Sequence, residues 1–230
     1  MQNINYWESK FQPCQYSDKL LGLIELLNKT ARIPADIETI KKACYVARLY
    51  HGDQTRKSLE PYYSHPLIVA YLFALYVGNN IQKYYTTDLI VIAILHDTIE
   101  DTKLTYEMIA EIFDRNVAEG VQDLTRIQDG MKISAEDSVD LLLLQRKKGI
   151  ILIKIFDRLH NARTIHFMSP KKITTILQET IRKFLFSSIY MEAIDTEKEL
   201  IEICHKYLPK QENQYRFSSE DNSLLPSLVW

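Results

Sequence analysis

The chain has 230 residues, of which 46% are hydrophobic and 25% are charged, and its formal net charge is −2. These values are ordinary for a globular domain, and they exclude a disordered chain and a protein that attracts nucleic acid through a strongly basic surface. Only six glycines and seven prolines interrupt the sequence, so the composition favours long helices over many short strands.

The chain carries three cysteines at wide spacing, Cys14, Cys44 and Cys204. They form neither a disulfide framework nor a zinc pattern, so free thiols and a cytoplasmic location are expected. The N-terminus lacks the basic start and apolar run of a signal peptide. The most apolar runs, residues 89–95 and 150–156, are too short to span a membrane, and no membrane partner is expected.

Apolar residues recur at helical spacing along most of the chain. Residues 1–16 show no clear period and are expected to form an N-terminal arm. Helices are predicted, in chain order, over residues 17–28, 35–51, 67–77, 89–100, 105–113, 116–127, 171–194 and 197–207. The helix over 89–100 is apolar nearly all round, which places it at the centre of the fold.

Three segments do not follow a helical pattern. Residues 128–137 are polar and irregular, which predicts a mobile loop. Residues 150–156 are mostly apolar and β-branched, so they fit a buried strand or a buried helix equally well. Residues 209–230 are expected to be a C-terminal tail, either docked or disordered. No internal repeat or second-domain boundary is visible, so one domain is expected over residues 17–208.

Polar residues that suit catalysis gather at the end of the predicted central helix. His96 and Asp97 follow an apolar run, and burying them is costly unless a partner such as a divalent cation neutralises them. A His-Asp pair also occurs by chance at helix ends. Glu100 and Asp101 favour the functional interpretation, because Glu100 shares a helix face with His96 and three crowded carboxylates favour a bound cation.

Two further residues complete a candidate metal site. His65 precedes Pro66 and an apolar helix, and Asp157 follows the buried segment 150–156. Two imidazoles and two carboxylates, from His65, His96, Asp97 and Asp157, suit manganese or another octahedral divalent ion better than structural zinc. The separation of these residues in the sequence leaves their convergence open.

Two other polar segments are candidates for substrate binding. Arg56, Lys57 and Ser58, followed by Tyr62, form either an exposed polar loop or a platform for an anion and a base. If residues 157–164 are helical, Asn161 and Thr164 share the face of Asp157 and suit contacts with a ribose or base. Arg158, His160 and Arg163 would then point elsewhere and be structural.

Together these segments resemble the hydrolase domain of RelA/SpoT proteins. Residues 51–58 (HGDQTRKS), 60–62 (EPY) and His65-Pro66 are similar to the opening motifs of that family. His96-Asp97 with residues 100–102 is similar to the central motif, and residues 151–164 to the third. Order and spacing agree, and the resemblance covers about residues 36–195.

The resemblance implies an all-α HD-type fold, the helical bundle of HD-domain phosphohydrolases, in which residues 150–156 are helical. It implies one Mn²⁺ per chain, bound by His65, His96, Asp97 and Asp157, and hydrolysis of the 3′-pyrophosphate of guanosine tetra- and pentaphosphate, (p)ppGpp, to GDP or GTP. Glu100 and Asp101 would orient or deprotonate the attacking water. The implied substrate contacts are Arg56, stacked on guanine, with Lys57, Ser58, Tyr62, Asn161 and Thr164.

The sequence departs from the family pattern in two places. Residues 134–141 match poorly, and residues 184–189 replace a segment that the family usually carries. The expected protein is a small stand-alone hydrolase, or a hydrolase fragment, that acts on a small-molecule nucleotide. The alternatives are an HD-type phosphatase of another nucleotide such as NADPH, and a catalytically silent nucleotide-binding module. The sequence does not predict the oligomeric state.

Overall fold

The structure, a computed structural model, describes residues 6–128 and 131–208. Its elements are α1 (Trp7–Lys10), α2 (Gln15–Asn28), α3 (Ile37–His51), α4 (Ser64–Asn80), α5 (Thr87–Leu95), α6 (Thr98–Asp101), α7 (Tyr106–Ile112), α8 (Arg115–Leu124), β1 (Ile127–Gln128), β2 (Met131–Lys132), α9 (Ala135–Leu144), α10 (Lys148–Arg163), α11 (Pro170–Glu179), α12 (Leu185–Tyr190) and α13 (Ile194–Tyr207). The fold is all-α, as predicted. The two described strands have two residues each and pair as a short antiparallel hairpin.

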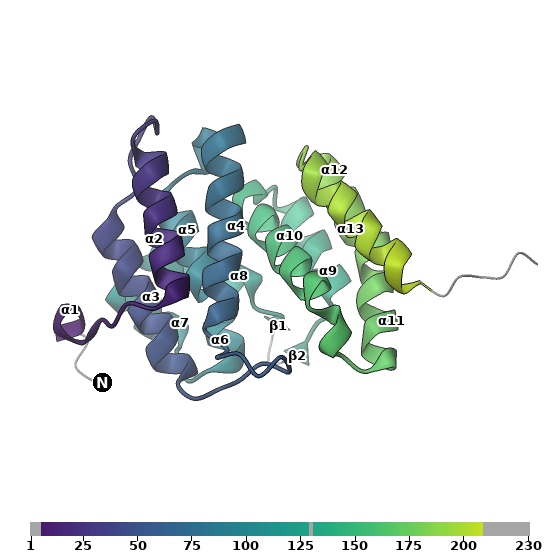
Figure 1. The fold of residues 1–230 in the computed structure, drawn as a ribbon, viewed down its shortest axis with the longest axis horizontal. Helices are drawn as coiled ribbons and strands as arrows, with labels where there is room; N and C mark the ends of the chain where they lie inside the picture. The colour runs from purple at the N-terminus through teal and green to yellow at the C-terminus, as the bar shows by residue number, and fades with distance from the viewer. Residues whose placement is uncertain (1–5, 129–130, 209–230) are drawn as a thin grey trace, which may run out of the picture.

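Helix α4 lies in the middle of the bundle and packs against α2, α5 and α10 (Figure 1). Residues 90–95 of α5 are all buried, which confirms that this apolar segment is central. Residues 150–156 lie within α10 and are buried too, so the ambiguous segment is a buried helix. Burial of these apolar residues is the main source of stability, because it removes a large nonpolar area from water.

Polar caps explain where several helices begin. Asp36 accepts hydrogen bonds from the backbone N–H groups of Glu38 and Thr39 at the start of α3. Thr86 and Asp114 accept in the same way at the starts of α5 and α8. Each side chain satisfies an N–H group that has no partner within the first helical turn. The Thr86 cap fixes where α5 begins. The helix then ends at Leu95, directly before His96 and Asp97.

The predicted helix over residues 89–100 is interrupted. Helix α5 ends at Leu95, and the short α6 begins at Thr98, so His96 and Asp97 lie in the bend between them. The Thr98 hydroxyl donates to the Leu95 carbonyl at 2.7 Å, a local side-chain bond that competes with the helical pattern. The bend allows the side chains of His96 and Asp97 to face the same side.

The predicted mobile loop over residues 128–137 is wrong from Ala135 onward. Helix α9 starts there, because Ser134 accepts a hydrogen bond from the Asp137 N–H at 3.0 Å. The Ser134 hydroxyl also donates to the Asp137 carboxylate at 2.7 Å, which holds the capping side chain in place. The poorly matching segment 134–141 is therefore an ordinary helix start.

The predicted single helix over residues 171–194 is also wrong. Helix α11 ends at Glu179, a π-helical turn spans Thr180–Phe184, and α12 ends at Tyr190. Ser187 and Ser188 donate to backbone carbonyls one turn earlier, which weakens the regular pattern. The chain then turns at Glu192, whose φ of 57° ends the helix, and α13 returns along α12.

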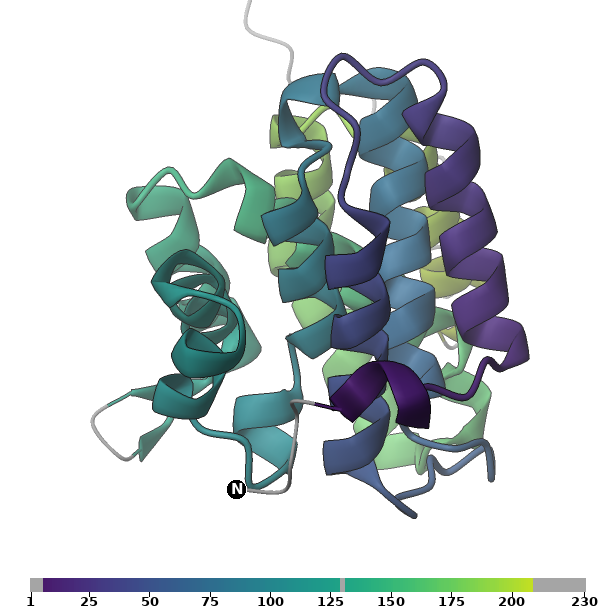
Figure 2. The same cartoon turned by 90° about the vertical axis from the view of Figure 1, so that its left-hand side faces the viewer.

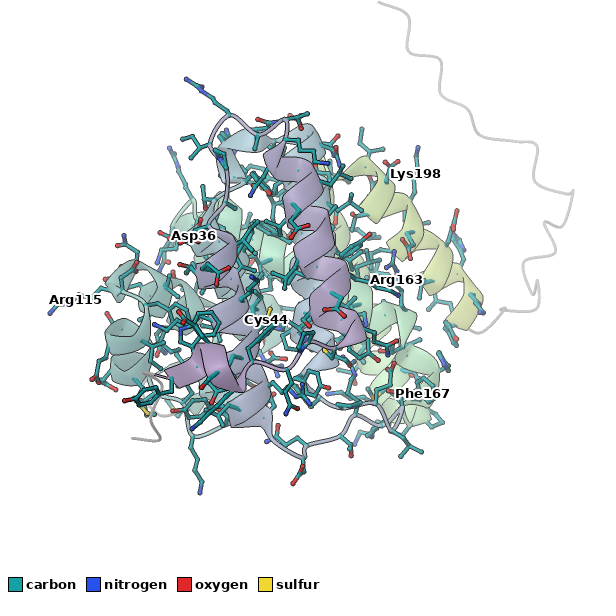
Figure 3. The ribbon with its side chains drawn as sticks, turned by 60° about the vertical axis from the view of Figure 1, so that its left-hand side comes forward. Asp36, Cys44, Arg115, Arg163, Phe167 and Lys198 are labelled. Carbon is teal, nitrogen blue, oxygen red and sulfur yellow. The ribbon has the colours of Figure 1, made fainter. Side chains whose placement is uncertain are left out.

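The helix and loop ends that carry the candidate residues gather at one end of the bundle, the lower end in Figure 1. The β1–β2 hairpin projects at this end, next to α8 (Figure 2). Figure 3 shows Arg115 reaching away from the body of the molecule, whereas Cys44 lies inside it. In the described part of the chain, no helix is both long enough and apolar enough to cross a membrane.

Gly120 allows α8 to approach α5 closely. A Cβ atom at this position would overlap Ile92 Cδ1, whereas one at Gly22 in α2 would meet nothing within 4 Å. Alanine favours a helix interior by about 1 kcal/mol over glycine, so Gly22→Ala should stabilise the protein by about that amount. Gly120→Ala should instead destabilise it by roughly 1–3 kcal/mol through overpacking. Urea unfolding checks both, and a stabilised Gly120→Ala would contradict the close packing.

Candidate active site

A cavity of about 380 Å³ opens at the end of the bundle where the candidate residues gather. Its lining includes all four predicted metal ligands, together with Arg56, Lys57, Tyr62, Glu100, Asp101 and Asn161. A larger cavity of about 610 Å³ lies on the other side of the loop over residues 52–63, against the N-terminal arm. That larger cavity is lined by none of the candidate residues, so the smaller one is the candidate active site.

The four predicted metal ligands converge, although they come from three separate parts of the chain. His65 lies in the first turn of α4, and its Nε2 lies 3.1 Å from Asp157 Oδ1 of α10. His96 Nε2 lies 3.7 Å from the same oxygen, and the three donor atoms lie within 4.8 Å of one another. Asp97 flanks this triad, with one oxygen 3.4 Å from His65 Nε2 and the other 3.1 Å from His96 Nε2.

The hydrogen bonds of His96 show that a cation fits this cluster. Its Nδ1 lies 2.9 Å from the Ala93 carbonyl, which can only accept, so Nδ1 carries a proton and Nε2 is the nitrogen left to bind a metal ion. The side chain is 4% exposed, and among the described residues Nε2 has no hydrogen-bond partner. In a neutral ring this atom is a lone pair that faces two carboxylates, which is unfavourable unless a cation, either a proton or a metal ion, lies between them. The residues therefore form a candidate site for a divalent metal ion.

The pKa values of the cluster support the same conclusion. Burial opposes a charge on His96, but Asp97 and Asp157 outweigh it and hold the His96 pKa well above its usual range. Burial would also raise the pKa of Asp97, yet His96 and His65 hold that pKa well below its usual range. The two carboxylates thus remain ionised and attract positive charge, which a divalent ion supplies.

Glu100 and Asp101, the predicted catalytic pair, have different surroundings. Glu100 binds the Arg126 guanidinium through Oε1 at 3.0 Å and the Arg126 backbone N–H through Oε2 at 3.2 Å. Asp101 accepts a hydrogen bond from the Tyr62 hydroxyl at 2.7 Å. The same hydroxyl lies 3.2 Å from Asp97, so Tyr62 bridges a candidate metal ligand and a candidate base.

The predicted substrate residues divide into two groups. Arg56 donates to Asn161 Oδ1 and to Thr164 Oγ1, each at 3.2 Å, so this loop residue reaches two side chains that were predicted to share a helix face with Asp157. Lys57 lines the cavity. Ser58 and Thr164 do not line it, and Ser58 donates to Glu60 at 3.0 Å instead.

His160 was expected to point away from the site, and this expectation is wrong. Its ring meets that of His65 edge to edge, with a centroid distance of 4.9 Å and 26° between the ring planes, and the two Nδ1 atoms lie 2.7 Å apart. Burial, together with His65 and Arg56, lowers the pKa of His160 to about 3, so the ring is neutral near pH 7. In a helix, residue 160 lies only about 60° from residue 157, and this angle was the available signal.

The sequence analysis also passed over three cations, and it wrongly expected a fourth, Arg158, to point away from the site. Arg126, Lys154, Arg158 and Lys172 all line the cavity. Lys154 precedes Asp157 by three residues on α10, which is the signal that would have found it. Arg126 follows α8, and nothing in its local sequence points to Glu100. Arg163, by contrast, pairs with Glu199 at the surface, as its predicted structural role requires.

Lys154 is 6% exposed and donates to the Leu124 carbonyl at 3.0 Å. Burial lowers its pKa from 10.5 to about 8. Because an unfolded lysine keeps a pKa near 10.4, burying the charge costs the folded state roughly 3 kcal/mol below pH 8. The cost disappears as the pH rises from about 8 toward 10, where the folded protein loses the proton first.

Lys154→Met is therefore expected to raise the free energy of unfolding of the metal-free protein near pH 7 by roughly 1–3 kcal/mol. The gain should shrink above pH 8, since the native lysine is then neutral. Urea unfolding in chelator, once near pH 7 and once above pH 8, measures this gain in unfolding free energy, with Lys42→Met as the control. Lys42 also donates to a backbone carbonyl, but it is only partly buried. An equal gain at both pH values would contradict the buried charge.

Comparison with known proteins places this geometry in context. The HD domain family model matches residues 43–185. The chain is 32% identical over 192 residues to GTP pyrophosphokinase rsh of Brucella ovis, covering 80% of this chain and 25% of that protein. It is 34% identical over 188 residues to the bifunctional (p)ppGpp synthase/hydrolase SpoT of Escherichia coli K12, covering 77% of this chain and 26% of SpoT.

A solved structure shares the fold. It is that of a metazoan ortholog of SpoT that hydrolyses ppGpp, with a TM-score of 0.57 and 19% sequence identity, covering 73% of this chain and 94% of that one. The chain spans about a quarter of the length of the two bacterial relatives.

Proposed function

This chain belongs to the HD domain family, and we propose that it is a metal-dependent hydrolase that releases the 3′-pyrophosphate of (p)ppGpp. The observation that carries the proposal is the composition of one cavity. The imidazole and carboxylate cluster lies there beside six cationic side chains: Arg56, Lys57, Arg126, Lys154, Arg158 and Lys172. Lys57 and Lys172 are exposed, and such cations suit a substrate that carries several phosphates. The similarity to SpoT supports this substrate class.

We assign Mn²⁺ as the metal, one ion per chain, held by His65, His96, Asp97 and Asp157. A mixed set of two nitrogen and two carboxylate ligands suits this ion. When bound, it would supply Lewis acidity that polarises a phosphoryl oxygen and acidifies a nearby water.

The protein side chains would hold the substrate and accept the proton. Arg56 is held by two acceptors at the C-terminal end of α10, and its planar guanidinium would stack on guanine. Lys57 would contact the phosphates, and Asp101 would accept a proton from the attacking water. Ser58 and Tyr62 would hold the loop and the carboxylates in place through Glu60 and Asp101.

The three cysteines are free thiols in the structure. They support the cytoplasmic location that we propose, because free thiols persist in a reducing compartment. The substrate would be a small-molecule nucleotide, and the near-neutral chain gives no reason to add a nucleic-acid partner.

The test is pyrophosphate release from ppGpp by the purified protein, with Mn²⁺ and with chelator, while chromatography follows GDP. Release that requires Mn²⁺ is the expected result. Bound Mn²⁺ without release would overturn the substrate assignment, and NADPH and other nucleotides would then be assayed for phosphate release. Nucleotide binding without turnover of any substrate would overturn the assignment as an enzyme.

A further inference from the structure

His160 lies between the loop over residues 52–63, which carries Arg56, and the cluster of candidate metal ligands. Its side chain is 6% exposed, and it lies on α10 one turn after Asp157. The Nδ1 atom lies 3.3 Å from Arg56 Nη1 and 2.7 Å from His65 Nδ1. One nitrogen thus contacts both a residue assigned to the substrate and a residue assigned to the metal.

The direction of these two hydrogen bonds follows from the chemistry of arginine. A guanidinium only donates, so His160 Nδ1 must be the acceptor in its contact with Arg56. An imidazole nitrogen that accepts carries no proton, so His65 Nδ1 must donate to it. His65 therefore carries a proton on Nδ1, and Nε2 is the nitrogen left to bind a metal ion. That Nε2 atom faces Asp157 at 3.1 Å, inside the cluster.

We propose that His160 is a positioning residue that fixes the metal-binding tautomer of His65 and, through the same nitrogen, anchors Arg56. A histidine binds metal through a nitrogen that carries no proton, and the hydrogen bond at its other nitrogen decides which one that is. The nearly coplanar contact of the two rings also sets the orientation of the His65 imidazole. His160 thereby couples the position of the loop that carries Arg56 to the affinity of His65 for the metal ion. The role of Arg56 in this link depends on the proposed function, but the contact with His65 does not.

Two substitutions separate hydrogen bonding from packing. His160→Leu fills similar space but has no acceptor. His160→Asn keeps an acceptor oxygen close to the position of Nδ1. We expect His160→Leu to weaken Mn²⁺ binding to the free protein by roughly 10–100-fold, the usual effect of losing the partner of a metal-binding histidine. It should also raise the KM for ppGpp, because Arg56 loses an acceptor. His160→Asn should bring both the Mn²⁺ affinity and the KM for ppGpp most of the way back to their wild-type values.

Calorimetric titration of the metal-free protein with Mn²⁺ measures the affinity without any nucleotide. His166→Leu is the control, because this exposed histidine lies outside the cavity. Wild-type Mn²⁺ affinity in His160→Leu would overturn the proposal, and so would a folded His160→Asn variant that binds as weakly as the leucine variant. If wild-type protein binds Mn²⁺ but leaves ppGpp intact, the proposed function fails while this titration still tests His160.

A measurement on the native protein covers the case in which His160→Leu does not fold. Long-range ¹H–¹⁵N spectra distinguish the two tautomers of a neutral histidine. We expect the proton of His65 on Nδ1 and that of His160 on Nε2. A His65 ring protonated on Nε2 and not on Nδ1 would overturn the proposal without any substitution.

Discussion

Replacing His96 with alanine is expected to abolish metal binding and hydrolysis together. His96 Nε2 is the one atom of the cluster that is buried and lacks a hydrogen-bond partner in the described part of the chain, so the metal is its natural partner. Losing the ion would remove several kcal/mol of transition-state stabilisation, on the order of a 10³-fold fall in kcat/KM. Alanine cannot restore the ligand, and no other histidine joins the described metal triad besides His65.

Thermal unfolding with and without Mn²⁺ checks the metal directly. A ligand at about 100 times its Kd stabilises the native state by about 2.7 kcal/mol, so wild-type Tm should rise with Mn²⁺. The variant should unfold at the same temperature with Mn²⁺ and with chelator. His205→Ala is the control, because that histidine is exposed on α13. A Tm rise equal to wild type in His96→Ala would remove His96 from the metal site.

The candidate metal ligands could be recognised in the sequence because polar residues seldom lie next to apolar runs that become buried. His65, His96 and Asp157 are polar residues directly beside apolar runs, and such residues need a reason to be buried. Their convergence could not be predicted from the pattern alone, since it depends on how α4, α5 and α10 pack. The resemblance to the RelA/SpoT hydrolase domain provided that step, and the distances in the structure agree with it.

The sequence analysis also missed contacts between residues that are far apart in the chain. Arg56 and His160 are separated by 104 positions, and their contact depends on the path of an irregular loop. Arg126 meets Glu100 because α8 ends beside α6, a placement that no local periodicity encodes. The errors in helix boundaries have a local cause instead. Serine and threonine side chains at 98, 187 and 188 bond to nearby carbonyls, and hydrophobic spacing does not report these bonds.

Asp101→Asn is expected to lower kcat by about 10²–10⁴-fold while Mn²⁺ binding is retained, which is the usual effect of losing a general base. Asparagine has nearly the same shape and still accepts the hydrogen bond from Tyr62, but its amide cannot take a proton from water. Asp101 is exposed to the cavity, and its contact with Tyr62 occupies only one oxygen. Both the geometry and the chemistry therefore favour Asp101 as the base over its neighbour.

Glu100→Gln is the matched comparison, because it makes the same charge change one residue away. Both Glu100 oxygens bind Arg126, so this carboxylate is poorly placed to accept a proton from water. Glu100→Gln should weaken the hydrogen bonds to Arg126. It should therefore mainly raise the KM for the polyphosphate substrate, with a smaller effect on kcat. Steady-state kinetics with saturating Mn²⁺ separates the two residues. If Glu100→Gln lost kcat while Asp101→Asn kept it, the roles would be reversed, and Arg126 would have to release Glu100 when the nucleotide binds.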